Sequence, residues 1–230
     1  MKLRFILAFV LASALVLAVG DQGYRLIRSP RVGQENRLRL TAEIDLLGTS
    51  ATFSAVVIEK VTAVDASGNY TIESRQTEAT TSYGGKESKV ADTGTRSAIY
   101  LPTGELKEIK VGGQNTADIR LARLGGFVAP DRELKPGESW SHTYTTSGEG
   151  GVGGKADYKL VKTEILESRA AAIVEMKYAE TSGASPASAV GKAWIDIGTG
   201  EILRLESTWK NAPLMGPDVP LNAKLTLVKA

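Results

Sequence analysis

Residues 97–111 read SAIYLPTGELKEIKV, and residues 192–207 read KAWIDIGTGEILRLES. In both stretches an apolar segment leads into a Thr-Gly-Glu turn, and a second segment follows in which apolar and charged residues alternate. A glycine-containing turn between segments with a period of two is typical of an antiparallel β-hairpin. The two stretches therefore predict that the same hairpin occurs in each half of the chain.

Two further pairs of segments extend this similarity. Residues 32–35 (VGQE) precede a run at 38–46 in which apolar and polar residues alternate, and residues 136–138 (PGE) precede a similar start in the second half. The segment 57–62 then corresponds to the segment 159–164. These pairs predict an internal repeat with a period near half the chain. The alternative is that two unrelated meanders look alike, because Thr, Gly and Glu are ordinary turn residues.

Alternation with a period of two dominates the chain, and it predicts an all-β protein with minor α content. About a dozen antiparallel strands in one continuous meander cannot stay flat, so we expect a curved sheet shaped like a half-barrel or barrel. One short helix interrupts the strands, because Asn115 or Thr116 can cap its start and Gly125-Gly126 can end it. The predicted fold thus has two related halves with this helix between them.

The first twenty residues have the features of a signal peptide. Lys2 and Arg4 precede an apolar core at residues 5–19, and Ala18-Val19-Gly20 offers small residues for cleavage after Gly20. The apolar core is shorter than the ~20 residues that a spanning helix needs, so an uncleaved anchor is the less favoured alternative. We therefore expect an exported protein, periplasmic or extracellular, in a bacterial envelope.

The predicted boundaries follow from these patterns. They are a signal peptide at residues 1–20, a first β half at 21–111, a connector with the short helix at 112–136, and a second β half at 137–230.

Composition argues against several classes of partner. The net charge of the whole chain is +2, and Lys2 and Arg4 account for it, so the chain without residues 1–20 is balanced and no nucleic-acid binding is expected. With no Cys and a single His, we expect no metal site and no cofactor. Five arginines do gather after the cleavage point: Arg25, Arg28, Arg31, Arg37 and Arg39. This cluster is compatible with peripheral contact to anionic lipid or to an acidic partner, but arginines on the exposed face of a strand are the stronger interpretation.

We find no pattern that predicts catalysis. His142, the single histidine, falls in a predicted strand, and no Gly-x-Ser-x-Gly motif occurs. The glycine-rich segment 148–155 lacks the hydroxyl residue and the following helix of a phosphate-binding loop. Asp196 and Glu201 flank the second Thr-Gly turn, where turn formation is their simplest role. We predict no enzyme and no catalytic residue, and a carboxylate-based hydrolase remains the second alternative.

Large apolar side chains are concentrated in the second half, which holds all three Trp residues. Trp and Met suit adaptable apolar pockets. We therefore predict that Tyr144, Trp194, Trp209 and Met215 line a site for an apolar small molecule or lipid on the concave face of the sheet. The alternative is that these residues are the core of the second half.

A different class of function is also open. The polar segment 77–89 can form a free sheet edge that pairs with another envelope protein, in which case the chain is a structural or interaction module without a small-molecule ligand. The oligomeric state is not predicted.

Residues 193–205 (AWIDIGTGEILRL) resemble the late hairpin of the lipoprotein-carrier (LolA-like) superfamily, in which an aromatic residue, an Asp and a Thr-Gly turn precede an Arg-Leu strand. Residues 135–140 (KPGESW) are similar to a segment of uncharacterised exported bacterial proteins with a two-part layout. The resemblance implies a curved, unclosed sheet with helices over an apolar cavity, and carriage of lipids or lipid-modified proteins. The carrier family has more helix than this chain predicts, so no functional residue is transferred. Together with composition, this favours an exported, non-enzymatic binding protein of the cell envelope.

Overall fold

The computed structural model describes residues 22–46, 48–92, 94–111, 116–145, 152–216 and 219–230. The predicted signal peptide lies outside these residues, as does Asn115. The described residues form twelve strands and one helix: β1 (Glu35–Leu46), β2 (Thr49–Val64), β3 (Tyr70–Tyr83), β4 (Lys86–Lys89), β5 (Arg96–Tyr100), β6 (Leu106–Val111), α1 (Thr116–Leu124), β7 (Ser139–Tyr144), β8 (Gly154–Leu166), β9 (Arg169–Glu180), β10 (Ser188–Asp196), β11 (Ile202–Ala212) and β12 (Leu221–Lys229).

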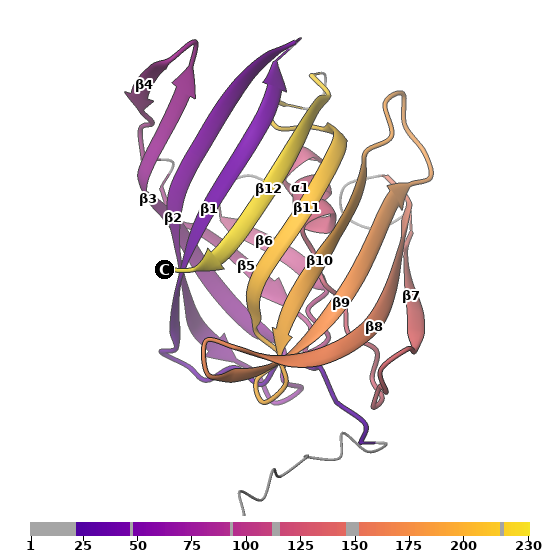
Figure 1. The fold of residues 1–230 in the computed structure, drawn as a ribbon. Helices are drawn as coiled ribbons and strands as arrows, with labels where there is room; N and C mark the ends of the chain where they lie inside the picture. The colour runs from indigo at the N-terminus through magenta and orange to yellow at the C-terminus, as the bar shows by residue number, and fades with distance from the viewer. Residues whose placement is uncertain (1–21, 47, 93, 112–115, 146–151, 217–218) are drawn as a thin grey trace, which may run out of the picture.

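All twelve strands belong to one antiparallel sheet. Its order is β6-β5-β3-β2-β1-β12-β11-β10-β9-β8-β7, and β4 pairs with β3 outside this path. The sheet curves strongly, so that β5 and β6 lie behind β11 and β12 in the view of Figure 1. It does not close, because within the described residues no pairing joins β6 to β7. The prediction of a curved, all-β meander is confirmed.

The first and last strands meet in the middle of the sheet. β1 pairs with β2 on one side and with β12 on the other, and Ala42 lies opposite both Phe53 and Leu225. Leu38 and Ala42 are buried, as strict alternation in β1 predicts for residues that face the inside of the curve. Each half is therefore a continuous meander, and the two halves join through the pair β1–β12.

Helix α1 lies inside the curve of the sheet, behind β11 in Figure 1, and it contacts this strand. Leu124 is fully buried, and the position that a Cβ atom would take on Gly125, just past the helix, is 3.4 Å from the ring of Trp209. The short helix predicted between the halves is thus confirmed. Among the described residues, no helix is both long and apolar enough to cross a membrane.

The main hydrophobic core belongs to the second half. Its buried members come from β7 to β11, from α1 with the connector after it, and from the segment that precedes β1, and none of them lies in β1 to β6. Several aromatic rings fill this core. Trp140 stacks on Tyr158 with ring centres 5.2 Å apart, and Phe127 meets Tyr158 edge-on at 5.7 Å.

The same backbone contacts recur in both halves. The N–H of Gly33 donates to the carbonyl of Val61 at 2.8 Å, and the N–H of Gly137 donates to the carbonyl of Leu160 at 2.7 Å. Gly33 precedes β1 as Gly137 precedes β7, and Val61 and Leu160 lie in the next strand of each half. These contacts define which positions of the two halves correspond.

The segment that precedes each half is held by the other half. The N–H of Ser29, ahead of β1, donates to the carbonyl of Thr199 in the β10–β11 turn at 3.1 Å. The N–H of Ala129, ahead of β7, donates to the carbonyl of Thr103 in the β5–β6 turn at 2.8 Å. Each Thr-Gly turn therefore accepts a hydrogen bond from the segment that precedes the other half, so the two halves are joined by reciprocal contacts.

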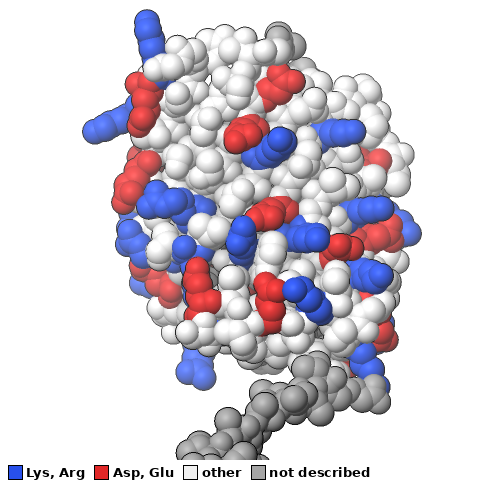
Figure 2. Space-filling view, viewed as in Figure 1, with Lys and Arg blue, Asp and Glu red and all other residues white. Residues whose placement is uncertain are grey.

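Charges are interspersed on the outer face of the sheet. Figure 2 shows Lys and Arg next to Asp and Glu across this face. Two of these contacts are ion pairs between or along strands, Lys192 with Glu175 at 3.4 Å and Lys155 with Asp157 at 2.9 Å. All four side chains are about half exposed, so these pairs add solubility more than stability.

Candidate ligand-binding cavity

A cavity of about 560 Å³ lies inside the curve, mainly over the first half. Its apolar lining comes from six parts of the fold: Leu38 (β1), Ile72 (β3), Leu106 (β6), Ile119 (α1), Phe127 (connector) and Leu227 (β12). The volume is in the range of small-molecule sites, which are concave and mostly apolar with a few polar groups.

At two positions along the cavity, the first half carries polar side chains where the second half has large rings. The recurring contacts place Asn36 and Glu59 where the second half has Trp140 and Tyr158. In each half the two residues are direct cross-strand partners, Asn36 opposite Glu59 and Trp140 opposite Tyr158. Asn36 and Glu59 both line the cavity, whereas Trp140 and Tyr158 stack within the core.

A third corresponding pair follows the same rule. Ser29 corresponds to Ala129, so Arg28 occupies the place of Val128, which is buried. The guanidinium carbon of Arg28 lies 5.4 Å from the centre of the Tyr70 ring. Its Nε and Nη2 atoms are buried and donate to no acceptor of the described residues. A buried donor without an acceptor costs free energy, so this arginine requires an explanation beyond the fold.

Two tyrosines complete this end of the cavity. Tyr70 stacks on Tyr100 with ring centres 5.6 Å apart, and both line the cavity. Burial raises the pKa of Tyr70 to about 12 and raises that of Tyr100 as well. Burial also raises the pKa of Glu59, against the attraction of Arg28. We call Arg28, Asn36, Glu59, Tyr70 and Tyr100 the polar end of the cavity.

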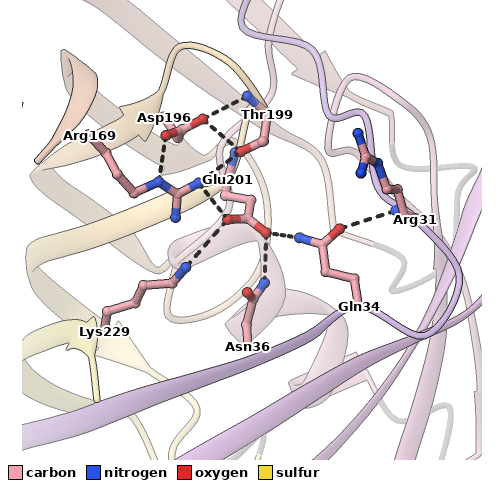
Figure 3. Close-up of polar contacts among 8 residues, drawn as sticks. All are labelled: Arg31, Gln34, Asn36, Arg169, Asp196, Thr199, Glu201 and Lys229. Carbon is pink, nitrogen blue, oxygen red and sulfur yellow. Dashed lines mark hydrogen bonds and ion pairs between the residues drawn. The ribbon is translucent and has the colours of Figure 1, made fainter.

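A second polar cluster lies next to the polar end (Figure 3). Glu201 accepts hydrogen bonds from Gln34, from Asn36 at 3.1 Å and from Arg169 at 3.0 Å, and Lys229 lies 3.6 Å away. Burial opposes ionisation of Glu201, but hydrogen bonds from Asn36 and Arg169 outweigh it and keep the pKa below its usual value. The carboxylate is therefore saturated with donors, and it ties β1, β9 and β12 together.

Asp196 has the turn-forming role that its position predicts. Its Oδ1 accepts from the N–H of Thr199 at 2.7 Å and from the Thr199 hydroxyl at 2.8 Å, and its Oδ2 accepts from Arg169 at 2.7 Å. Burial opposes ionisation of Asp196, but these hydrogen bonds outweigh it and lower the pKa. Asp196 and Glu201 thus share one arginine, and both are fixed by the β10–β11 turn.

Two of the four predicted ligand-binding residues lie inside the curve. Tyr144 lines the cavity, and its ring lies 4.7 Å from the guanidinium carbon of Arg123. Trp209 is buried in the core and donates from Nε1 to the hydroxyl of Ser207 at 3.0 Å. Trp209 does not line the cavity, so the two residues do not form one site.

The other two lie away from the cavity. Ala193 and Ile195 are fully buried in the core, so alternation puts Trp194 on the outer face of β10. There Trp194 donates from Nε1 to Glu164 at 2.9 Å, and Arg204 lies 4.9 Å from its ring centre. Met215 is 67% exposed. The four residues therefore do not gather around one cavity, and ligand contact by them stays a prediction.

The gap between the two free edges is bridged by side chains. Nε2 of His142 on β7 lies 3.3 Å from Oε1 of Glu105, next to β6, and Glu105 lines the cavity. The contact with His142 lowers the pKa of Glu105. The single histidine thus helps to hold the cavity wall together. No group of three potential metal ligands occurs among the described residues.

Comparisons with known proteins give weak likenesses. No family model matches the chain, and no curated protein is significantly similar in sequence. Three solved structures share 11% identity with it. One is the hypothetical lipoprotein YmcC from Escherichia coli, with 84% of each chain covered and a TM-score of 0.31. Another is described as an exported protein with a YmcC-like fold from Bacteroides fragilis, with 90% of this chain and 99% of that chain covered and a TM-score of 0.36. The third is a DUF1329 family protein from Desulfovibrio piger, with 86% and 84% covered and a TM-score of 0.23. None of the three descriptions names the lipoprotein-carrier superfamily, and at these TM-scores we draw no conclusion from them.

Proposed function

We propose that this chain is an exported binding protein of the cell envelope that holds an apolar or amphipathic ligand, such as a lipid, in the cavity over its first half. The predicted signal peptide supports export. The size of the cavity and its apolar lining, interrupted by a few polar groups, support a small ligand.

The difference between the two halves carries this proposal. If the fold alone dictated the interior, corresponding positions would be filled alike. Instead, the second half packs Val128, Trp140 and Tyr158 into or against its core, and the first half places Arg28, Asn36 and Glu59 along a cavity that Val128 also lines. Filling the cavity would stabilise the protein by burying more apolar surface, so its retention favours a function.

A substitution that fills the cavity tests the proposal. Ala122 on α1 lines the cavity, so Ala122→Trp should block it. Protein purified from its native envelope is analysed by native mass spectrometry and lipid extraction. We expect a co-purifying lipid with the unsubstituted chain and with Ala66→Trp, a control at an exposed turn residue, and none with Ala122→Trp. A clean apo mass for all three folded proteins would contradict the proposal.

Strand addition at a sheet edge is a weaker candidate. The exposed strand β4 pairs with β3 and with no other strand of the described chain. It is only four residues long and carries Lys86, Glu87 and Lys89, and short charged edges discourage pairing with another chain. The shortness and the charges of β4 therefore argue against an interaction module and favour the binding proposal.

A carboxylate-based hydrolase is also less favoured. Its candidate pair, Asp196 and Glu201, accepts hydrogen bonds from cationic and amide donors, which hold both pKa values low. A general acid needs a raised pKa to carry a proton near neutral pH. We therefore propose a non-enzymatic role.

A further inference from the structure

We propose that Arg28 binds the anionic head group of the ligand, so that the cavity selects amphiphiles with an acidic head, a carboxylate or a phosphate, over neutral ones. This inference rests on the proposed binding function and adds the chemical class of the ligand.

The first argument is the unsatisfied state of Arg28. Nε and Nη2 have no acceptor among the described residues, although both atoms are buried. Arginines in protein interiors are normally paired, because leaving buried donors of a charged group without a partner is strongly unfavourable. Guanidinium groups recognise carboxylate and phosphate by paired N–H donors, which is the kind of acceptor that Arg28 lacks.

The neighbouring carboxylates do not supply that acceptor. Glu59 acts on Arg28 only through charge, since no hydrogen bond or ion pair within 4 Å joins them in the described structure. Glu201 is occupied by Gln34, Asn36, Arg169 and Lys229. An arginine that was present only for structure would be expected to meet one of these two carboxylates directly.

The second argument is the arrangement around Arg28. The guanidinium carbon lies 5.4 Å from the centre of the Tyr70 ring, a cation–π contact that holds this group at the polar end of the cavity. The polar end adjoins apolar side chains such as Leu38 and Ile72, and apolar lining continues to Ile119 on the helix. A ligand whose head group binds Arg28 would thus have its apolar chain in apolar surroundings. This arrangement matches an amphiphile, which has one polar and one apolar end.

The third argument is the comparison between the halves. Val128 occupies the place of Arg28 and packs in the core, so the fold does not need a charge at this position. The same is true of Glu59, whose counterpart is Tyr158. Two charges at positions that are otherwise filled by core residues point to a ligand rather than to the sheet.

The experiment compares ligands that share one chain and differ in the head group. Dodecanoate, dodecyl phosphate and dodecan-1-ol are titrated into the full chain, and affinity is measured by calorimetry. We expect at least one anion to bind about tenfold more tightly than the alcohol, because a charge-assisted hydrogen bond contributes a difference in affinity of this order. The ratio between the two anions tells which acidic head is preferred.

Substitutions then locate the preference. Arg28→Gln should abolish the preference for the anion and leave the affinity for dodecan-1-ol unchanged, and Arg28→Lys should restore part of it. Arg25→Gln is the matched control, because Arg25 is exposed and pairs with Asp131 outside the cavity. If Arg28→Gln does not fold, Glu59→Gln keeps the inference testable: in a titration made above the raised pKa of Glu59, removing its negative charge should tighten anion binding and leave the alcohol unaffected.

The outcomes separate the two proposals. Alcohol binding without a preference for either anion, a preference that survives in Arg28→Gln, or no effect of Glu59→Gln would overturn the head-group inference and leave the cavity proposal standing. If none of the three ligands binds, the cavity proposal fails, and the head-group inference fails with it.

Discussion

Arg120 on α1 and Glu180 at the end of β9 form a buried, two-point ion pair. Nε donates to Oε1 at 2.7 Å and Nη2 donates to Oε2 at 2.8 Å, and the side chain of Glu180 is fully buried. Glu180 also accepts from the N–H of Ala187, while Arg120 reaches the carbonyl of Ser185. This pair anchors the short helix, one wall of the cavity, to the second half.

Breaking the pair should therefore loosen the helix. Glu180→Gln leaves Arg120 buried without its counter-charge, and we expect a loss of about 3–5 kcal/mol in the free energy of unfolding. Urea unfolding followed by circular dichroism measures it. Glu175→Gln is the control, because Glu175 forms a half-exposed pair with Lys192 and should cost less than about 1 kcal/mol. Equal losses in the two variants would show that α1 is not anchored in this way.

The β10–β11 turn should tolerate no side chain at Gly200. A Cβ atom there would lie 2.5 Å from the carbonyl oxygen of Ile27, and φ is +69°. Gly85 has a similar φ of +76° but no atom within 4 Å of its Cβ position. Gly85→Ala measures the backbone strain alone, about 1 kcal/mol. Gly200→Ala should cost about 1–3 kcal/mol more in thermal or urea unfolding. A difference near zero would mean that the contact with Ile27 gives way easily.

The stability contribution of Glu59 should depend on pH with a defined sign. Burial raises the pKa of this carboxyl in the folded state, so the folded chain holds its proton more tightly than the unfolded chain. Wild-type stability is then unaffected below the unfolded pKa and falls as pH rises through the folded pKa. Glu59→Gln removes this loss, and its melting temperature relative to wild type should increase from about pH 4 to neutral pH.

Glu138, a carboxyl whose pKa is shifted in the opposite direction, provides the control for that experiment. Hydrogen bonding by the N–H of Lys135 lowers the pKa of Glu138, with a smaller contribution from Arg132. Glu138→Gln should therefore lose stability relative to wild type as pH rises. If Glu59→Gln and Glu138→Gln changed in the same direction, the assignment for Glu59 would be wrong.

The contact between Glu105 and His142 should stabilise the closed side of the cavity. The contact with His142 lowers the pKa of Glu105, so its contribution to stability is present above the unfolded pKa and is lost as pH falls through the lower folded pKa. We expect Glu105→Gln to melt below wild type at about pH 6 and together with it at about pH 3. Glu108→Gln is the control, because Glu108 on β6 has no ion-pair partner within the described chain. A deficit that persists in acid would point to packing instead.

Much of the fold can be predicted from local patterns. The Thr-Gly turns, the alternation in β1 and the short helix after residue 115 all follow from rules that act over a few residues. The turn role of Asp196 could be predicted for the same reason, since its partner Thr199 is three residues away.

The site could not be predicted from composition. Concentration of Trp in the second half suggested a pocket there, but Trp209 is core and Trp194 faces outwards. Large rings fill space, so a cavity is more readily found where they are absent. The absence of large rings becomes informative only when the register between β1 and β2 is known, because that register shows that Glu59 and Asn36 are cross-strand partners.

One signal for the site was present in the sequence. The internal repeat aligns Pro-Gly-Glu before β7 with Val-Gly-Gln before β1. In this alignment Asn36 of the first half corresponds to Trp140 of the second. Arg28 was grouped with exposed arginines because charge clusters usually face solvent. The sequence alignment of 57–62 with 159–164, however, sets Glu59 against Val161. The backbone contacts of Gly33 and Gly137 correct this alignment by three residues and set Glu59 against Tyr158.

The crossed contacts of Ser29 with Thr199 and of Ala129 with Thr103 also set an order of events in biogenesis. The N-terminal arm lacks its contact with the β10–β11 turn until the chain near residue 200 has been synthesised, and β1 lacks its partner β12 until the last ten residues emerge. Neither half can finish folding while the other is still being delivered. A polypeptide that must thread through a narrow translocation channel in extended form benefits from such a delay, since premature compaction would stall its passage.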